Sequence, residues 1–210
     1  MNFEEYKILS EKTLSTEFNC TKKDELLLHA VIGILTEIDE LFDNELSEST
    51  DYTNKGEEIA DCIWYFAIIA RQYNLTVDTN IPDENSLLPF EILLKITQNS
   101  LKLLDFLKKK LFYNKTINED LFIQYSQEIM CLFISYSNSY NVNIGTVLDT
   151  NIEKLRARYG DKFSSERAIN RNLGVEREIL ENTLIIDGKN YVPYEKDYIS
   201  DISTRPLDFK

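Results

Sequence analysis

Apolar residues recur at helical spacing over several long segments of this chain. Residues 22 to 44 carry one apolar stripe of this kind, and residues 54 to 73 carry a second. A shorter amphipathic segment covers residues 3 to 15, and we expect it to pack against the rest of the protein. The chain contains only six glycines and four prolines, so these stretches are rarely interrupted. The pattern predicts an all-α helical bundle.

Capping residues and polar stretches mark where these helices begin and end. Thr21 followed by Asp24 resembles a capping box at the start of the helix over 22 to 44. Residues 44 to 54 are polar and predict a loop, with Thr53 as the N-cap of the next helix. Residues 77 to 86 contain Pro82 and a cluster of Asn, Asp and Ser, which indicates a linker.

The chain then repeats its first half in outline. Residues 92 to 108 align with 26 to 42, and residues 126 to 144 align with 59 to 77. This self-similarity favours a duplicated helical hairpin, with a chance likeness of two amphipathic hairpins as the alternative. Under either interpretation, the sequence predicts a four-helix core.

We predict one all-α domain over residues 1–181, followed by a C-terminal tail over 182–210. The domain divides into a first hairpin at 22–73, a second hairpin at 88–144, a basic helix at 145–159, and one further helix from Ser164 or Ser165 to about 181. In the tail, Asp187 and Gly188 lie between short β-prone runs, which predicts a short β-hairpin.

Composition restricts the classes of partner. The 210 residues are 43% hydrophobic and 28% charged, which is typical of a soluble globular protein, and the net charge is −13. This charge disfavours duplex nucleic acid and anionic membranes as partners, and a nucleotide substrate would require a metal ion and local cations. The chain has three cysteines, an odd number, and two of them lie in apolar runs, which predicts reduced, buried thiols. No secretory leader is evident, so we expect a cytoplasmic protein.

Two carboxylate pairs are the strongest chemical signal. Glu37 and Glu40 lie three residues apart on the first predicted helix, and Glu58 and Asp61 have the same spacing on the second. Residues three apart share one helix face, so each pair can offer its oxygens to one hard divalent cation such as Mg²⁺. The alternative is a solvated acidic face. The second pair, however, precedes the most apolar stretch of the chain, residues 62 to 70, where unpaired carboxylates would be costly.

The second hairpin has lost most of these groups. Leu103, Phe106 and Tyr125 stand where the first hairpin has Glu37, Glu40 and Glu58, and only Glu128 remains at the position of Asp61. The carboxylates are therefore an addition in the first hairpin, and the fold does not require them.

The basic helix carries a second constellation. Asn151, Lys154 and Arg158 fall on one face of it. Lysine and arginine can neutralise phosphate oxygens, and an asparagine amide can bind a base edge or a sugar hydroxyl. The alternative is a solvated basic helix end that complements its own dipole. Next to a metal site, this face would serve as a phosphate clamp.

Taken in order, these segments resemble the MazG-like all-α NTP pyrophosphohydrolases. The likeness rests on E-x-x-E, a spacer of 17 residues and E-x-x-D, together with "LLHAVIGILTEIDELFD" and "NIEKLRARYGDKFSSERAINRN". It covers about residues 3 to 181 and is nearest to the phage and bacterial branch. The chain departs from short members of the family by the inserted second hairpin, which is similar to the duplicated arrangement of dimeric dUTPases.

The resemblance implies Mg²⁺-dependent hydrolysis of a nucleoside triphosphate to the monophosphate and pyrophosphate, with Mn²⁺ as a substitute metal. It implies a homodimer or higher homo-oligomer. Lys154 and Arg158 would contact phosphates, Asn151 the sugar or base, and Tyr159 would either close over them or pack. The metal ligands, one of which could orient the attacking water, would be Glu37, Glu40, Glu58 and Asp61.

Neighbouring residues leave alternatives open. Tyr65 shares the face of Asp61 and could stack on a nucleotide, whereas Trp64 is expected in the core. His29 either faces the same cleft or is a core histidine.

The alternative function is a non-catalytic helical regulatory or interaction protein that binds nucleotide or metal. A di-iron carboxylate bundle is excluded, because its two Glu-x-x-His pairs need more than one histidine. Base and sugar preference stay undetermined.

Overall fold

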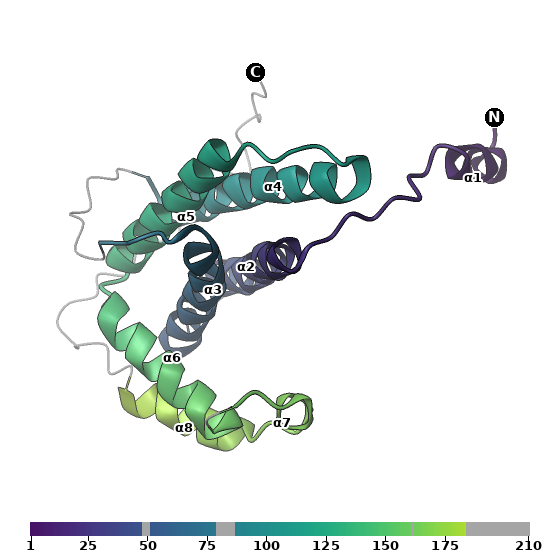
Figure 1. The fold of residues 1–210 in the computed structure, drawn as a ribbon. Helices are drawn as coiled ribbons and strands as arrows, with labels where there is room; N and C mark the ends of the chain where they lie inside the picture. The colour runs from purple at the N-terminus through teal and green to yellow at the C-terminus, as the bar shows by residue number, and fades with distance from the viewer. Residues whose placement is uncertain (48–50, 79–86, 161, 184–210) are drawn as a thin grey trace.

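A computed structural model describes residues 1–47, 51–78, 87–160 and 162–183. All of the regular structure in these ranges is helical, which confirms the all-α prediction (Figure 1). The helices are α1 (Phe3–Glu11), α2 (Lys22–Leu46), α3 (Tyr52–Tyr73), α4 (Pro89–Tyr113), α5 (Glu119–Ser139), α6 (Ile144–Tyr159), α7 (Ser165–Ile169) and α8 (Leu173–Thr183).

Four helices form the core, as the two apolar hairpins predict. α2 packs along α3 and α4 packs along α5, while α2 also contacts α4 and α3 contacts α5. The apolar stripes of all four helices meet in one cluster of buried side chains, whose central members include Leu27, Ile34, Ile59, Ile96, Leu103 and Phe133. Burial of these stripes is the main stabilising contribution to the bundle.

The local signals at the helix starts are partly confirmed. Thr21 and Asp24 form the predicted capping box: the backbone N–H of Thr21 donates to the Asp24 carboxylate at 2.9 Å, and the Asp24 N–H donates to the Thr21 hydroxyl at 3.3 Å. The prediction of Thr53 as an N-cap is wrong. The N-cap is Asp51, two residues earlier, because its carboxylate accepts a hydrogen bond from the N–H of Asn54 at 3.0 Å, and α3 begins at Tyr52.

The C-terminal helices lie on one side of the core. α6 packs against α3, and α8 packs against α6. The single helix predicted from Ser164 or Ser165 to 181 is instead broken between Ile169 and Leu173. The Asn172 side chain accepts a hydrogen bond from the N–H of Val175 at 3.3 Å, so it begins a new helix in place of continuing the old one.

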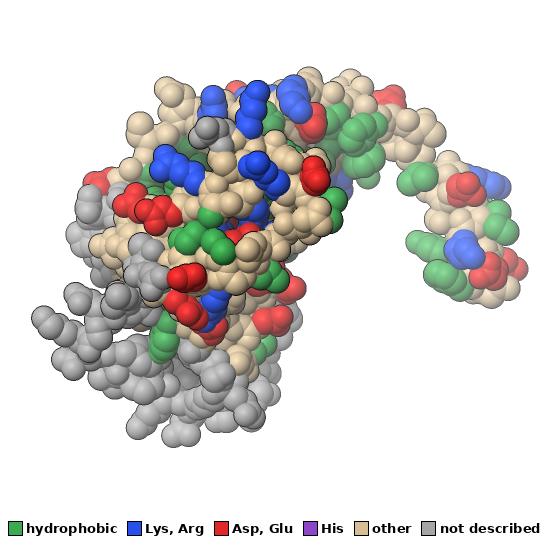
Figure 2. Space-filling model, turned by 90° about the horizontal axis from the view of Figure 1, so that it is seen from below, with side chains coloured by type: hydrophobic (Ala, Val, Ile, Leu, Met, Phe, Trp, Pro, Cys, Tyr) green, Lys and Arg blue, Asp and Glu red, His purple; other side chains and the backbone are tan. Residues whose placement is uncertain are grey.

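α1 differs from the expectation that it packs. None of its residues is buried, and the helix stands away from the rest of the molecule with hydrophobic side chains exposed (Figures 1 and 2). The segment between α1 and α2 nevertheless contacts the end of α4. The centroids of the Phe18 and Phe112 rings are 5.5 Å apart, and the Asn19 N–H donates to the Leu111 carbonyl at 2.8 Å.

Several further expectations can be placed. The β-hairpin predicted around Asp187 and Gly188 lies outside the described residues. Among the described helices, none combines the length and apolar character needed to cross a bilayer. The cysteines are free thiols; Cys62 is buried as expected, whereas Cys131 and Cys20 are exposed.

Candidate metal centre

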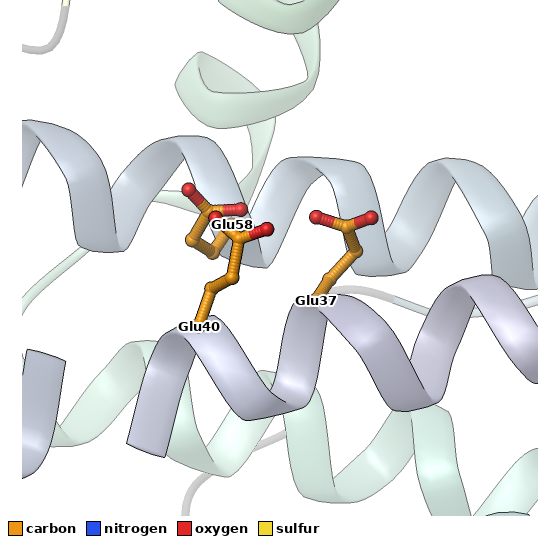
Figure 3. Close-up of side chains that lie close together, drawn as sticks. All are labelled: Glu37, Glu40 and Glu58. Carbon is orange, nitrogen blue, oxygen red and sulfur yellow. The ribbon is translucent and has the colours of Figure 1, made fainter. Parts of the chain in front are cut away.

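Three of the four predicted carboxylates meet between α2 and α3. Each of Glu37, Glu40 and Glu58 offers one oxygen, and these oxygens lie within 4.8 Å of one another. Figure 3 shows the two α2 side chains and the α3 side chain pointing toward a common point. The spacing of three residues places Glu37 and Glu40 on the same face of α2, and the short connection to α3 brings Glu58 opposite them.

The three carboxylates of this cluster repel one another, so a bound proton or cation would stabilise it. Glu58 is only 5% exposed. Burial, reinforced by the negative charge of Glu40, raises the pKa of Glu58 from its ordinary value of 4.5 to about 9. Burial also raises the pKa of Glu37, with nearby acidic groups adding to the effect. Three converging carboxylates are a hard, oxygen-only donor set, which fits Mg²⁺ or Mn²⁺.

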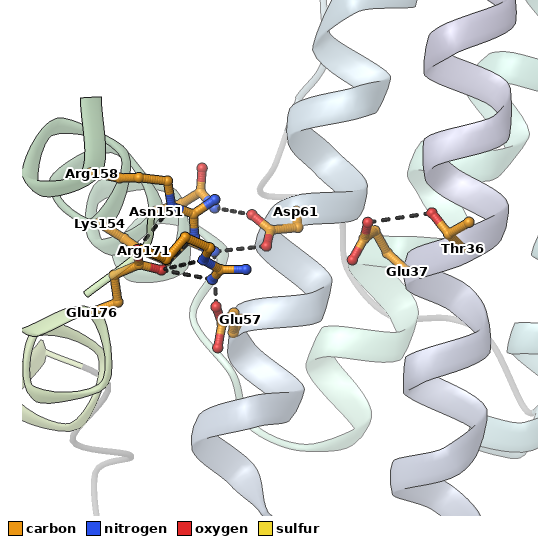
Figure 4. Close-up of polar contacts among 9 residues, drawn as sticks. All are labelled: Thr36, Glu37, Glu57, Asp61, Asn151, Lys154, Arg158, Arg171 and Glu176. Atoms are coloured by element: carbon orange, nitrogen blue, oxygen red, sulfur yellow. Dashed lines mark hydrogen bonds and ion pairs between the residues drawn. The ribbon is translucent and has the colours of Figure 1, made fainter. Parts of the chain in front are cut away.

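Asp61, the fourth predicted ligand, faces α6. Its two oxygens accept hydrogen bonds from the Asn151 side-chain amide at 2.5 Å and from the Lys154 ammonium at 2.7 Å (Figure 4). Asp61 is nevertheless close enough for its charge to raise the pKa of both Glu37 and Glu58. It therefore lies beside the three-carboxylate cluster and joins it to the cationic face of α6.

The cationic side chains of α6 are bound to carboxylates in this structure. Lys154 is completely buried and contacts Glu57 at 3.1 Å in addition to Asp61. Arg158 donates from Nε and Nη2 to the two oxygens of Glu176 on α8. Burial opposes the charge of Arg158, but these hydrogen bonds outweigh it and raise the arginine pKa. Contact with phosphate would require either cation to exchange or share its carboxylate partner.

An aromatic group adjoins the cluster. The Tyr65 ring lies directly over Gly33 of α2, where a Cβ atom would come within 2.2 Å of it. The His29 and Trp64 rings contact Tyr65 at centroid distances of 5.4 and 5.0 Å. His29 is exposed, so it is not a core histidine. The expectation that Trp64 is a core residue is wrong, since it is 39% exposed.

Tyr159 is the last residue of α6. Its ring is half-buried and packs on Phe163 at 5.2 Å, with the Arg158 guanidinium 5.6 Å from the ring centroid. These contacts favour the packing alternative for Tyr159.

The second hairpin has no equivalent of the cluster among the described residues. Leu103 is fully buried, and Phe106 packs against Phe122 and Tyr125 at 6.3 and 6.4 Å. Glu128, the one retained acidic residue, accepts a hydrogen bond from the Asn99 amide at 3.1 Å. Apolar and amide groups have thus taken the place of the carboxylates.

Lys55 lies in the first turn of α3 and is buried inside the protein. Its side chain is 1% exposed and forms an ion pair with Glu45. The hydroxyl of Tyr140 donates to the same carboxylate at 2.6 Å, and the Lys55 ammonium lies 3.6 Å from the Tyr140 ring centroid. This buried network joins α2, α3 and α5 near the first turn of α3, and no local spacing in the sequence could have revealed it.

Comparisons of the chain with models of protein families, with curated proteins and with solved structures gave no match.

Proposed function

We propose that this protein is a Mg²⁺-dependent hydrolase that converts nucleoside triphosphates to the monophosphate and pyrophosphate. The observation that carries the proposal is the convergence of Glu37, Glu40 and Glu58 within 4.8 Å, with the most buried of the three held at a pKa near 9 unless a cation is present. The order of acidic and basic segments along the sequence supports the same function.

The three carboxylates would hold the metal ion, and Asp61 would lie at its border. When bound, Mg²⁺ supplies charge neutralisation at phosphate oxygens and a more acidic water. Glu40 is the exposed member of the cluster, so its free oxygen is accessible to a water molecule that approaches from solvent. Oriented carboxylates and local cations are what in-line attack on a phosphoanhydride requires.

The α6 side chains would act mainly by holding Asp61. Asn151 and Lys154 each bind one of its oxygens, which fixes the carboxylate orientation next to the metal position. Exchange of Lys154 between Asp61 and a substrate phosphate would link substrate binding to the charge of the centre.

The aromatic group of Tyr65, Trp64 and His29 supplies a partly exposed apolar surface beside the carboxylates. A nucleobase could stack there.

The direct test is release of pyrophosphate from a panel of ribo- and deoxynucleoside triphosphates with Mg²⁺. Glu40→Gln removes one ligand charge at an exposed position, and we expect at least a hundredfold loss of turnover. Asp39→Asn is the matched control, because Asp39 is the exposed acidic neighbour outside the cluster and its change should leave turnover within twofold.

Absence of pyrophosphate with every substrate, together with metal binding that Glu40→Gln does not alter, would refute the enzyme proposal. Metal or nucleotide binding without turnover would instead support the non-catalytic alternative.

A further inference from the structure

A second polar site lies on the C-terminal helices. A pocket of about 360 Å³ is bounded by the end of α6, by α7 and the turn after it, and by the first turn of α8. None of its lining residues comes from α2 or α3, so it is separate from the carboxylate cluster. The volume is ample for a small anion with part of its hydration shell.

The pocket concentrates positive charge in an acidic protein. Four of the chain's seven arginines line it, namely Arg156, Arg158, Arg167 and Arg171, whereas Glu176 is the only acidic residue among the lining residues. Three positive charges are left over in a chain whose net charge is −13. Arginine is the side chain best suited to bind phosphate oxygens in a bidentate manner.

Glu176 holds two of these arginines in place. Its carboxylate is 4% exposed and accepts hydrogen bonds from Arg158 and from Arg171, the latter through Nη2 at 2.7 Å (Figure 4). Among the described residues, the hydrogen bonds of Arg171 use Nε and Nη2, which leaves Nη1 for another acceptor. The buried carboxylate therefore orients two guanidinium groups without neutralising the pocket.

The turn after α6 places Arg167 among the residues that line the pocket. Gly160 has a φ of +68°, which favours glycine, and a Cβ atom there would lie 3.1 Å from Nη1 of Arg167. That nitrogen donates to the Tyr159 carbonyl at 2.6 Å. The residues at the start of α8, Asn172 and Val175, also line the pocket, so the positive end of this helix dipole adds to the arginine charge.

We propose that this arginine pocket binds a multiply charged phosphate anion, either free pyrophosphate or the phosphate end of a nucleotide, at a site distinct from the carboxylate cluster. The proposal does not depend on turnover, because it concerns binding in the absence of a metal.

The test is titration of the full chain with pyrophosphate by calorimetry, in EDTA and at low salt. The double variant Arg156→Gln/Arg167→Gln removes two exposed guanidinium groups and leaves the Glu176 contacts in place. We expect it to weaken binding about tenfold or more. The charge-matched control Lys22→Gln/Arg71→Gln, on α2 and α3, should bind within twofold of the wild type, as should Glu40→Gln.

No binding by the wild type, equal weakening in both double variants, or loss of binding in Glu40→Gln would each overturn the proposal. A second measurement uses the wild-type protein, so its result does not depend on whether the variants fold. Pyrophosphate should protect Arg156, Arg167 and Arg171, but not Arg71, from an arginine-specific dicarbonyl reagent, as read by mass spectrometry. Equal protection of Arg71 would contradict the site.

Competition identifies the source of the anion. Displacement of pyrophosphate by a nonhydrolysable nucleoside triphosphate assigns the pocket to nucleotide phosphates, whereas retention of pyrophosphate assigns it to the free anion.

Discussion

Replacement of Lys154 by methionine tests whether this residue stabilises the folded protein through its ion pairs with Glu57 and Asp61. The lysine side chain is fully buried and contacts Glu57 and Asp61, which are 16% and 25% exposed. Methionine has a similar length, so the change removes the charge with little change in packed volume. Glu57 and Asp61, which lie one turn apart on α3, would then pack against α6 with no cation beside them.

The expected loss of stability lies between two limits. Removing one partner of a fully buried ion pair costs about 3–5 kcal/mol, whereas an exposed pair contributes about 0–1 kcal/mol. Water can reach both carboxylates here, so we expect a decrease of about 2–3 kcal/mol in the free energy of unfolding. Adding Asp61→Asn to Lys154→Met should recover about 1 kcal/mol or more, because it removes one of the unpaired charges.

Urea unfolding followed by circular dichroism measures both effects. The control is Lys22→Met, since Lys22 is 74% exposed and its pair with Glu25 should contribute little. A stabilising role of Lys154 is refuted if Lys154→Met has a free energy of unfolding no lower than that of Lys22→Met, or if the double variant shows purely additive losses.

Two further predictions concern the cluster and its aromatic neighbour. Gly33→Ala would press a Cβ atom into the Tyr65 ring; an overpacking cost of about 1–3 kcal/mol should exceed the helix-propensity gain of about 1 kcal/mol. Gly174→Ala, whose Cβ would meet its nearest neighbour at 3.6 Å, is the control, and a more stable Gly33→Ala in thermal unfolding would contradict the packing. The raised pKa of Glu58 means that its ionisation costs stability, a cost absent below about pH 4.5 and growing as pH rises toward 9. Calorimetry in buffers of different ionisation enthalpy should therefore show that Mg²⁺ binding at pH 7 releases protons and strengthens with pH; binding independent of pH from 6 to 9 would rule this out.

The helices could be predicted because their signals are local. The apolar period over α2 and α3, and the capping pair at Thr21 and Asp24, depend on residues within a few turns of one another. The same locality explains the errors. A polar stretch offers several capping residues, so the choice between Asp51 and Thr53 depended on which side chain reached a free N–H.

The carboxylate pairs could be predicted because their spacing is local, but the residues that bind Asp61 could not. Spacing placed Glu37, Glu40 and Glu58 on suitable faces, and the structure brings them together. Spacing could not show that Asp61 turns toward Asn151 and Lys154, because that contact joins residues about 90 positions apart in the chain.

The arginine pocket was missed for a related reason. Arg156, Arg167 and Arg171 become neighbours only through the turn at Gly160 and the break before α8, whereas the sequence predicted one unbroken helix across that break.

The proposed pyrophosphohydrolase activity can be tested by separating the products formed from a nucleoside triphosphate and Mg²⁺ on an ion-exchange column. We expect equal amounts of the monophosphate and pyrophosphate, and neither product when EDTA replaces Mg²⁺. Formation of the diphosphate and orthophosphate, or the same product yield in EDTA, would contradict it.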